Sequence, residues 1–538
     1  MNASQSPSEN ARGRRPSRRL WLPLATVVLA LALLGLIWSP VLNHVDRGLR
    51  IHFNNVVAAF AAATLLGWYT FLSGLSRRVR FGGLALLGLL VLAAFLTIRR
   101  VEFTGSMKPT LIFRWTPDRS DVLEAHWASQ RSAEDETAGS PSAGISATPH
   151  DVYEFRGPQR SGVCDSVKLA RDWAAQPPRL VWRQPVGGGY AAFVVAGPLA
   201  ITIEQRRDQE AVVAYDFDTG KERWRFQYPA LFSETLGGDG PRATPTIHDD
   251  KVYSLGATGV LACLELATGR KLWEVNILEE NGAGNVDWGM SGAPLVVGGV
   301  VIVNPGNQKG NATSRSLVAY DLQTGKRVWG VGDSKAGYSS PIVQSAAGRS
   351  QFILFDGSGL AGFDVAMPVE LWRIPWKSQF DINAAQPVPE GDDEFFITST
   401  AGAALIRVVS DGDKFAAEQV WKNNKLKCYF GTPVFYEGYL YGIDDTLLAC
   451  IEAATGRQRW KARAGDYGHG QLLRSGALLL VLSETGALAL VEANPERFHE
   501  FGRIQAIEGK TWNYPTLAGN RILVRNHLEM AAYDLPSE

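Results

Sequence analysis

The most informative stretch of this sequence is Leu317-Val-Ala-Tyr-Asp-Leu-Gln-Thr-Gly-Lys-Arg-Val-Trp329. Val318 and Tyr320 alternate with small or polar neighbours, which is the pattern of a half-buried β-strand. Thr324-Gly325 indicates a tight turn, because glycine adopts positive φ without steric cost. Trp329 ends a second strand, where its large ring can fill the space between packed sheets. The stretch therefore predicts two strands joined by a turn.

Similar stretches recur along the chain. Val212–Trp224, Leu261–Trp273 and Leu448–Trp460 match closely, and more degenerate copies lie between and after them. An aromatic residue closes each of eight segments: Trp182, Trp224, Trp273, Trp329, Trp372, Trp421, Trp460 and Phe501. Their spacing of 39 to 56 residues is the size of a four-stranded propeller blade.

The two ends of the repeat region complement each other. The last copy, which contains Ala531-Ala-Tyr-Asp-Leu535, has three predicted strands and lacks a fourth. Leu180-Val-Trp-Arg-Gln-Pro185 is a predicted fourth strand with no preceding three. Pairing these segments would close a ring and leave no exposed sheet edge. The sequence thus predicts an all-β, eight-bladed β-propeller over residues 151–538, closed by its N- and C-terminal strands.

Three apolar runs precede the repeats, at residues 21–39, about 56–75 and 81–98. Each has about the ~20 residues that cross a bilayer. The first run could be a secretory signal, but no small-x-small cleavage site follows it. We therefore expect three transmembrane α-helices within residues 21–98.

Basic residues set the expected orientation of these helices. Residues 1–20 contain five arginines, and Arg77, Arg78 and Arg80 lie between the second and third runs. The positive-inside rule puts both segments in the cytoplasm and everything after residue 98 outside. Residues 99–150 then form a tether and a flexible linker, since few large apolar residues occur in 116–150.

Composition and motifs exclude several classes of function. The formal net charge is zero, which gives no electrostatic case for nucleic-acid binding. The four cysteines form no Cys-x-x-Cys pair and no Cys-x-x-Cys-His haem site, and we interpret them as small buried hydrophobes. No His-Glu-x-x-His zinc motif and no Gly-x-Ser-x-Gly nucleophile elbow occurs.

The Tyr-Asp-x-x-Thr-Gly-Lys-x-x-Trp pattern resembles the repeat of the PQQ-like, quinoprotein-type propeller family, and the resemblance covers about residues 151–538. Phe155-Arg-Gly-Pro-Gln-Arg-Ser-Gly162 also resembles the first segment of envelope-attached members. The family holds PQQ-dependent dehydrogenases and non-catalytic propellers similar to the lipoprotein of the outer-membrane barrel assembly machine. In a bacterium, the resemblance implies an inner-membrane protein with a periplasmic propeller. The shared fold does not decide between the two functions.

Strand order indicates which loops meet. In an up-and-down blade, the loops after strands one and three lie on one face, together with the Thr-Gly turns. The loops after strands two and four lie on the other face, where aromatic and charged residues gather as in a binding rim. The candidate rim residues are Glu204, Arg206, Arg242, Trp288, Asn383, His469, Trp512 and Arg525.

A PQQ site would need a flat pocket, a Ca²⁺ ion with oxygen ligands and a carboxylate base. Trp288 or Trp512 could stack on the cofactor and Asp381 or Glu204 could act as the base, but no Glu/Asn/Asp set occurs at matching positions. The sequence therefore favours a non-catalytic module that binds a protein or peptide in the cell envelope, with no catalytic, cofactor or metal residue. The alternatives are a membrane-bound PQQ-dependent dehydrogenase that reduces quinone and, more weakly, a sensor of an envelope signal.

Overall fold

The computed structural model describes residues 20–42, 47–105, 107–116, 119–134, 145–234, 236–307, 311 and 313–538. The chain divides into two compact units, Met1–Thr116 and Pro117–Glu538. The expected basic segment 1–20 lies outside the described residues except for Leu20.

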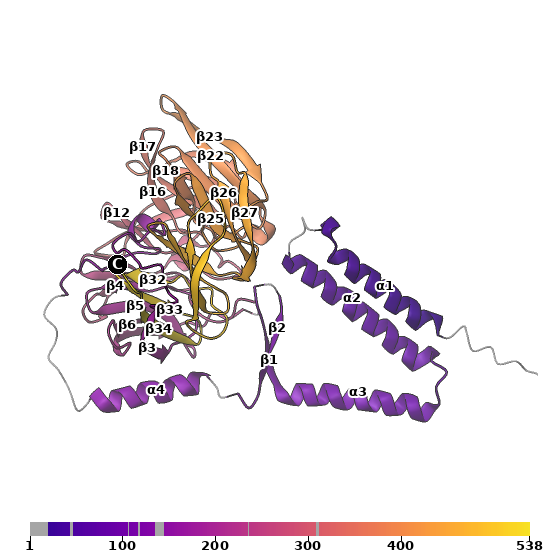
Figure 1. Cartoon of the computed structure of the whole chain (residues 1–538). Helices are drawn as coiled ribbons and strands as arrows, with labels where there is room; N and C mark the ends of the chain where they lie inside the picture. Colours follow the sequence, from indigo (N-terminus) through magenta and orange to yellow (C-terminus); the bar gives the residue numbers. More distant parts are fainter. Residues whose placement is uncertain are drawn as a thin grey trace, which may run out of the picture. The chain divides into compact units, whose positions relative to one another are not determined.

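The second unit contains eight four-stranded antiparallel sheets, which confirms the predicted eight-bladed propeller (Figure 1). Blade 1 consists of β4 (Val194–Ala196), β5 (Leu199–Arg206), β6 (Gln209–Asp216) and β7 (Glu222–Pro229), and blade 2 of β8 (Thr246–His248), β9 (Lys251–Leu255), β10 (Val260–Glu265) and β11 (Lys271–Asn276). Blade 3 consists of β12 (Leu295–Val297), β13 (Val300–Val303), β14 (Leu317–Asp321) and β15 (Arg327–Val331), and blade 4 of β16 (Ile342–Ala346), β17 (Arg349–Asp356), β18 (Gly359–Asp364) and β19 (Glu370–Pro375). Blade 5 consists of β20 (Val388–Glu390), β21 (Glu394–Ser399), β22 (Gly402–Asp411) and β23 (Lys414–Asn423), and blade 6 of β24 (Val434–Tyr436), β25 (Tyr439–Asp444), β26 (Leu447–Glu452) and β27 (Gln458–Asp466). Blade 7 consists of β28 (Gln471–Ser475), β29 (Leu478–Leu482), β30 (Ala487–Glu492) and β31 (Glu500–Gln505), and blade 8 of β32 (Thr516–Ala518), β33 (Arg521–Arg525), β34 (Glu529–Asp534) and β3 (Arg179–Pro185). A short helix, α5 (Ile277–Asn281), follows blade 2.

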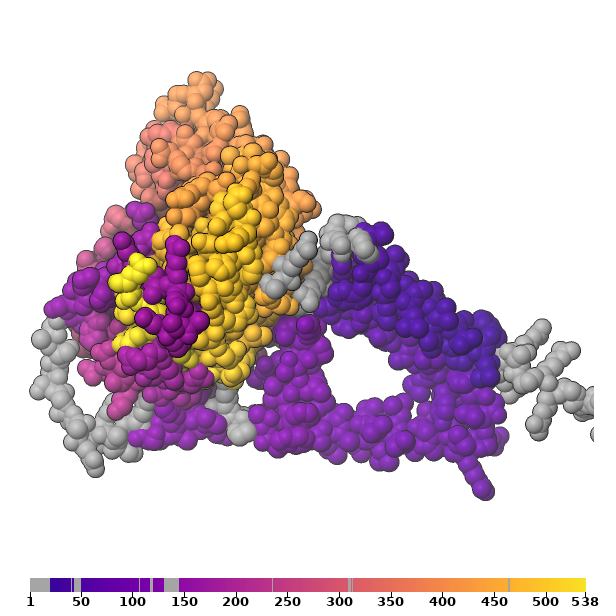
Figure 2. Space-filling model, in the orientation of Figure 1, coloured from indigo at the N-terminus to yellow at the C-terminus, as the bar shows by residue number. Residues whose placement is uncertain are grey.

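Blade 8 joins the two ends of the propeller. Strand β3 pairs antiparallel with β34, with Trp182 opposite Ala532 and Gln184 opposite Met530. In Figure 2, the yellow C-terminal residues lie directly beside purple residues from the beginning of the propeller. The prediction that the N-terminal strand completes the C-terminal blade is therefore confirmed.

The recurring motif holds adjacent blades together. In blade 3, one carboxylate oxygen of Asp321 accepts hydrogen bonds from the backbone N–H groups of Gln323 and Thr324 and from the Thr324 hydroxyl. This turn places Gly325 at a φ of 67° beneath the indole of Trp273 from blade 2. An added Cβ on Gly325 would lie 2.6 Å from that ring. Glycine is required here both for its φ and for the approach of the tryptophan.

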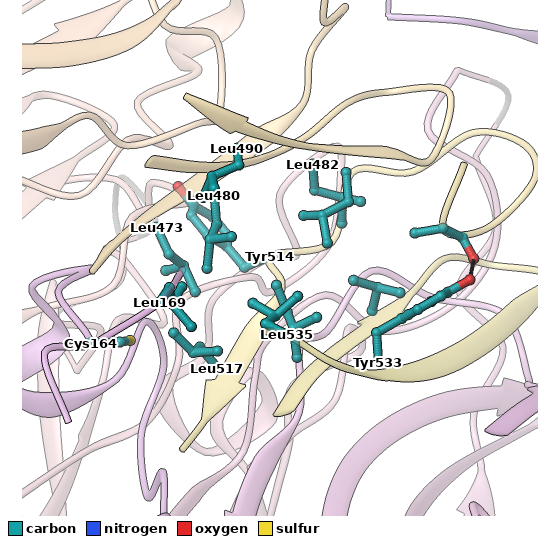
Figure 3. Packing of buried hydrophobic residues seen from close by; sticks show 14 of the residues in the cluster. Cys164, Leu169, Leu473, Leu480, Leu482, Leu490, Tyr514, Leu517, Tyr533 and Leu535 are labelled. Atoms are coloured by element: carbon teal, nitrogen blue, oxygen red, sulfur yellow. Dashed lines mark hydrogen bonds between the residues drawn. The ribbon is translucent and has the colours of Figure 1, made fainter. Parts of the chain in front are cut away.

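The core between blades 7 and 8 includes residues from the segment that precedes β3. Cys164 and Leu169 pack with Leu473 of β28 and Leu517 of β32 (Figure 3). Tyr533 of β34 lies at one side of this cluster, where its hydroxyl donates to the Ala506 carbonyl at 2.8 Å. This segment is therefore part of the propeller core.

Residues 151–165, here called the arginine segment, cross the face that carries the Thr-Gly turns, the turn face. The segment contacts the ends of the innermost strands there: Val152 bridges to Val195, and the N–H of Cys164 donates to the Arg474 carbonyl at 2.8 Å. Its Pro158–Arg160 turn (η3) carries a buried arginine. The segment thus covers the turn-face end of the propeller axis.

Two buried arginines reach from this segment into the axis. Arg160 is 2% exposed and donates to the carbonyls of Ala293 and Pro341 at 3.1 Å each, and also to that of Pro294. Arg156 donates to the Pro433 carbonyl at 3.1 Å. These carbonyls precede the innermost strands of three blades: Arg160 links the adjacent blades 3 and 4, and Arg156 binds blade 6.

Over its described residues, the first unit holds three α-helices and a hairpin. The elements are α1 (Trp21–Ile37), η1 (Pro40–Leu42), α2 (Arg47–Gly67), the π-helical turn η2 (Trp68–Leu72), α3 (Arg77–Thr97), β1 (Ile98–Phe103) and β2 (Pro109–Phe113). Among the described residues, two helical spans are long and apolar enough to cross a membrane, Arg50–Leu72 and Arg77–Thr97. The span Arg50–Leu72 starts earlier than the predicted residue 56, because the helix continues through polar residues before Val56. Helix α1, the first of the three predicted crossings, has 17 residues and is shorter than the two spans.

The linker expected over 116–150 contains a helix, α4 (Arg119–Glu134). Leu123 and Trp127 are both buried, since positions i and i+4 share one face of a helix. The Trp127 ring lies 3.6 Å from the Arg206 guanidinium, and Arg207 pairs with Asp121 at 3.2 Å. Two apolar residues one turn apart, together with the ion pairs to Arg207, therefore dock this part of the linker on blade 1.

Candidate binding face

The loops that lead into the innermost strands form the face opposite the turn face, here called the start face. Most of these loops carry a proline where the strand begins, as in Arg242-Ala-Thr-Pro245 and Phe430-Gly-Thr-Pro433. Three residues before the proline, or before its equivalent, blades 6, 7, 8, 1 and 2 carry Phe430, His469, Trp512, Tyr190 and Arg242. These five residues are here called the aromatic arc. Ring closure makes their five blades consecutive around the axis.

The rings of the arc contact one another, and Phe430 touches the rings of both blade 7 and blade 8. The Phe430 centroid lies 5.7 Å from that of His469 and 5.0 Å from that of Trp512. The Tyr190 centroid lies 5.3 Å from that of Trp512. The Arg242 guanidinium lies 5.6 Å from the Tyr190 centroid and ends the row. Such ring contacts each stabilise the arrangement by about 0.5–1.5 kcal/mol.

Polar partners fix how the rings are oriented. The indole N–H of Trp512 donates to Glu484 at 3.0 Å, and the backbone N–H of His469 donates to the same carboxylate at 3.3 Å. The Lys510 ammonium lies 4.4 Å from the Trp512 centroid and donates to the Gly237 carbonyl at 2.8 Å. The arc is therefore a preorganised surface in which His469 is buried and the other rings are half-buried.

The charged end of the arc lies in a low-dielectric environment. Burial lowers the pKa of Arg242, while Tyr190 and Glu234 act in the opposite direction. The Arg242 guanidinium donates to the Gly238 carbonyl at 3.0 Å and lies 3.7 Å from Glu234. The cation is therefore held by the loop of blade 2 and positions the adjacent Tyr190 ring.

A second aromatic group occupies the start face at blades 3 to 5. Trp288 lies 5.9 Å from Tyr338 and 6.3 Å from Phe380, measured between ring centroids. Burial raises the pKa of Tyr338 to about 12. Phe380 is 66% exposed on the short turn η4 (Gln379–Asp381). The predicted residue Trp288 therefore belongs to a group separate from the arc.

Two predicted rim residues of blade 1 are internal. The expected loop 204–210 is largely strand, because β5 continues to Arg206 and β6 begins at Gln209. Arg206 donates to Glu204 at 2.6 Å and to Glu222 at 2.8 Å, and Tyr215 donates to Glu204 at 2.8 Å. Glu204 and Arg206 thus form a buried ion pair inside the blade.

Asn383 and Arg525 are also fully buried. The Asn383 amide donates to the Asp356 carbonyl at 2.8 Å. Arg525 of blade 8 donates to the Thr202 hydroxyl of blade 1 at 2.6 Å and to the Gly187 carbonyl, in the loop that enters blade 1, at 3.0 Å. Both side chains support the start face from beneath, and Arg525 bridges the blades where the ring closes.

Three residues of the assembled surface are absent from the predicted rim set: Tyr190, Phe430 and Lys510. A sequence signal for the first two exists, because both occupy the position three residues before the blade-start proline or its equivalent. Lys510 carries no such signal. Its place over Trp512 depends on the path of the loop before β32.

The carboxylates Asp356, Asp381 and Glu204 do not fit a Ca²⁺-bound PQQ. Asp356 accepts two hydrogen bonds from Arg373, at 3.0 and 2.9 Å, and Asp381 pairs with Lys335 at 2.8 Å. Glu204 is paired with Arg206 as described above. No group of three metal-ligating side chains occurs within the part of the chain that the structure describes. These acids are engaged separately with cations and do not form a cluster of oxygen ligands.

Comparison with known proteins finds relatives of two kinds. A quinohemoprotein alcohol dehydrogenase, ADH IIB of Pseudomonas putida, is 28% identical over 206 residues, which cover 35% of this chain and 28% of that protein. The match thus spans less than a third of this relative. A solved quinohemoprotein alcohol dehydrogenase from Comamonas testosteroni has 14% identity and a TM-score of 0.51, covering 78% of this chain and 85% of its own, and shows the same fold. The crystal structure of BamB from Moraxella catarrhalis has 13% identity and a TM-score of 0.46, covering 66% and 98%.

A family model gives the broadest match to the repeats. The model described as outer membrane protein assembly factor BamB matches residues 173–284 and 208–462. Together these ranges span residues 173–462, which is more than half of the 538 residues. The propeller topology agrees with this match. The chain belongs to the BamB family of PQQ-like propellers.

Proposed function

We propose that this chain is a membrane-anchored, non-catalytic propeller that binds a protein or peptide segment on the aromatic arc. The observation that carries the proposal is the continuous row of rings at equivalent positions of consecutive blades. Tryptophan, tyrosine and arginine are the residue types that contribute most to protein interfaces. A rigid row in which Phe430, Trp512 and Tyr190 are half-buried gives a partner apolar contact area at a small cost in side-chain entropy.

The closed axis favours a partner that lies across the start face. Arg156 and Arg160 are buried and bind carbonyls at the starts of the innermost strands of blades 3, 4 and 6, so these side chains obstruct a path along the axis. The arc curves around this axis over five blades. An extended peptide with apolar or aromatic side chains matches this arrangement, since successive side chains can meet successive rings.

The proposed location is the inner membrane of the cell envelope, with the propeller on the outer, periplasmic side. We propose three crossings, by α1, by the span Arg50–Leu72 and by α3. Helix α1 is about 26 Å long at 1.5 Å per residue, somewhat less than the ~30 Å apolar core of a bilayer. The exposed apolar residues Leu20 and Trp38 flank it and extend its apolar length.

Selection of binding peptides tests the proposed site directly. Peptides from a random display library would be selected on the purified full-length protein, and their Kd measured for wild type, Trp512→Ala and Tyr190→Ala. We expect each substitution to raise the Kd at least tenfold, since it removes a central ring. Val328→Ala is the matched control, because Val328 is a 55% exposed residue of β15 outside the arc. Selected peptides that bind all four proteins equally would refute the proposed site.

The alternative function is a PQQ-dependent dehydrogenase that passes electrons to quinone. The 28% identity to ADH IIB over 206 residues favours it. Incubation of the full-length protein with PQQ and Ca²⁺, followed by dye reduction with alcohols and aldoses, separates the two functions. Dye reduction above the level of the untreated protein would replace the proposed function with this one.

A further inference from the structure

The hairpin that follows α3 has one apolar face. Strand β1 pairs with β2 so that Val101 lies opposite Leu111 and Phe103 lies opposite Pro109. Because side chains alternate along a strand, these four residues share one face of the hairpin. Val101 is 38% exposed and Leu111 is 46% exposed. An isolated two-stranded hairpin buries little apolar surface by itself, and Val101 and Leu111 therefore expose apolar surface on this face.

The hairpin is also strongly basic. Residues 98–116 contain four basic residues, Arg99, Arg100, Lys108 and Arg114, and one acidic residue, Glu102, so their net charge is +3. This charge contrasts with a net charge of zero for the whole chain. A basic segment with an apolar face is the combination that associates with the surface of an anionic membrane.

The base of the hairpin is fixed at the end of the α3 span. The N–H of Arg114 donates to the Thr97 carbonyl at 2.8 Å, and the Arg114 guanidinium lies 6.0 Å from the Phe95 ring. Trp115 is 68% exposed and stacks on Phe113 with centroids 4.7 Å apart. Aromatic and basic residues at the end of an apolar span are typical of the interface between lipid and water.

We infer that the β1–β2 hairpin lies on the membrane surface and binds anionic phospholipid headgroups. Its apolar face enters the boundary between the headgroups and the acyl chains, and Arg99, Lys108 and Arg114 contact the lipid phosphates. Arg100 lies on the opposite face, paired with Glu102, and adds to the attraction through its charge. This inference rests on the membrane anchorage proposed above and adds a specific lipid contact to it. The hairpin would then hold the end of α3 at the interface.

A fluorescent label on the hairpin tests this contact. The four native cysteines are buried, so a thiol-reactive fluorophore is expected to label an introduced cysteine selectively. Leu111→Cys places the label on the apolar face of the hairpin. Leu89→Cys, in the middle of α3, reports on anchorage, and Leu180→Cys, on exposed residue 180 of β3, reports on the propeller. The unmodified protein shows the background labelling.

The labelled full-length proteins would be placed in nanodiscs of phosphatidylcholine with about 30% phosphatidylglycerol, within the range of anionic membranes. Lipids with a quencher near the glycerol backbone should quench Leu111→Cys, and lipids with a quencher near the acyl end should quench Leu89→Cys. Leu180→Cys should stay unquenched. Changing the four basic residues to glutamine should weaken hairpin docking about fivefold per charge, as should pure phosphatidylcholine.

Three other results would each refute a different part of this inference or of the proposed anchorage. Quenching at position 89 without quenching at position 111 would refute the hairpin inference and leave the anchorage in place. Quenching at neither position would refute both. Quenching at position 111 that depends neither on lipid charge nor on the four basic residues would refute headgroup binding.

Discussion

Replacing Gly325 with alanine tests why the repeat motif contains glycine. The substitution has two separate consequences. First, alanine must adopt the left-handed φ of 67°, which costs about 1 kcal/mol. Second, its Cβ would lie 2.6 Å from the Trp273 ring, so blades 2 and 3 must separate locally. Such overpacking costs about 1–3 kcal/mol. We therefore expect a total loss of stability of about 3 kcal/mol.

Gly298 provides the matched control for the backbone effect. It lies in the same blade at a φ of 57°, and no atom lies within 4 Å of an added Cβ. Gly298→Ala should therefore carry only the cost of about 1 kcal/mol for the left-handed conformation. The difference between the two variants isolates the contact with Trp273.

Thermal unfolding of the full-length protein measures this difference. With an unfolding entropy of about 2.1 cal/mol/K per residue, the propeller should lose about 4 °C in Tm for Gly325→Ala and about 1 °C for Gly298→Ala. Trp273→Leu would remove most of the steric conflict, so adding Gly325→Ala to that variant should cost little more than the control. Equal Tm values for Gly325→Ala and Gly298→Ala would refute the proposed role of the tryptophan contact.

Three further predictions concern other parts of the molecule. Arg160→Met leaves several buried carbonyls on the axis without a donor, so we expect a loss of at least about 3 kcal/mol in unfolding measurements, and an unchanged Tm would contradict this. Burial, followed by the nearby Glu394 carboxylate, raises the pKa of Glu390 to about 7, so the wild-type protein should lose stability as the pH rises from about 4.5 to 7. Glu390→Gln should then raise the Tm at pH 8 and leave it nearly unchanged at pH 4, whereas an equal effect at both pH values would contradict the shift. Trp127→Ala should speed proteolysis within α4 without changing the Tm of the propeller, because that helix is docked mainly by Leu123 and Trp127.

Much of the fold could be predicted because its signal is local and repeated. Each copy specifies a strand, a turn and a strand, and eight copies at blade spacing leave ring closure as the simplest way to pair the free ends. Helix α4 could not be predicted in the same way. Its apolar face consists of Leu123 and Trp127 in a polar stretch, and its stability depends on a blade surface that the local sequence does not reveal.

The candidate site could be predicted only in part, because polarity does not show which way a side chain points. The sequence predicts Glu204 and Arg206 as exposed loop residues, but the two side chains form an ion pair inside blade 1. Arg525 is also internal, since it connects blades 8 and 1. The position relative to the blade-start proline is more informative, because it identifies Tyr190 and Phe430 beside the predicted Trp512.

A degenerate repeat affects the contacts between two blades and not only the blade that it encodes. The tryptophan of one blade packs on the glycine of the next, so the motif acts across a boundary between two copies. The first copy is degenerate, yet Trp182 packs on Gly220 because the turn of blade 1 is intact. Blade 3 has a complete motif, yet the turn of blade 4 carries Met367-Pro368, and Trp329 packs instead near Phe352 at 5.8 Å. Whether a tryptophan is held therefore depends on the following repeat, and loss of one Thr-Gly turn should weaken the boundary with the blade before it.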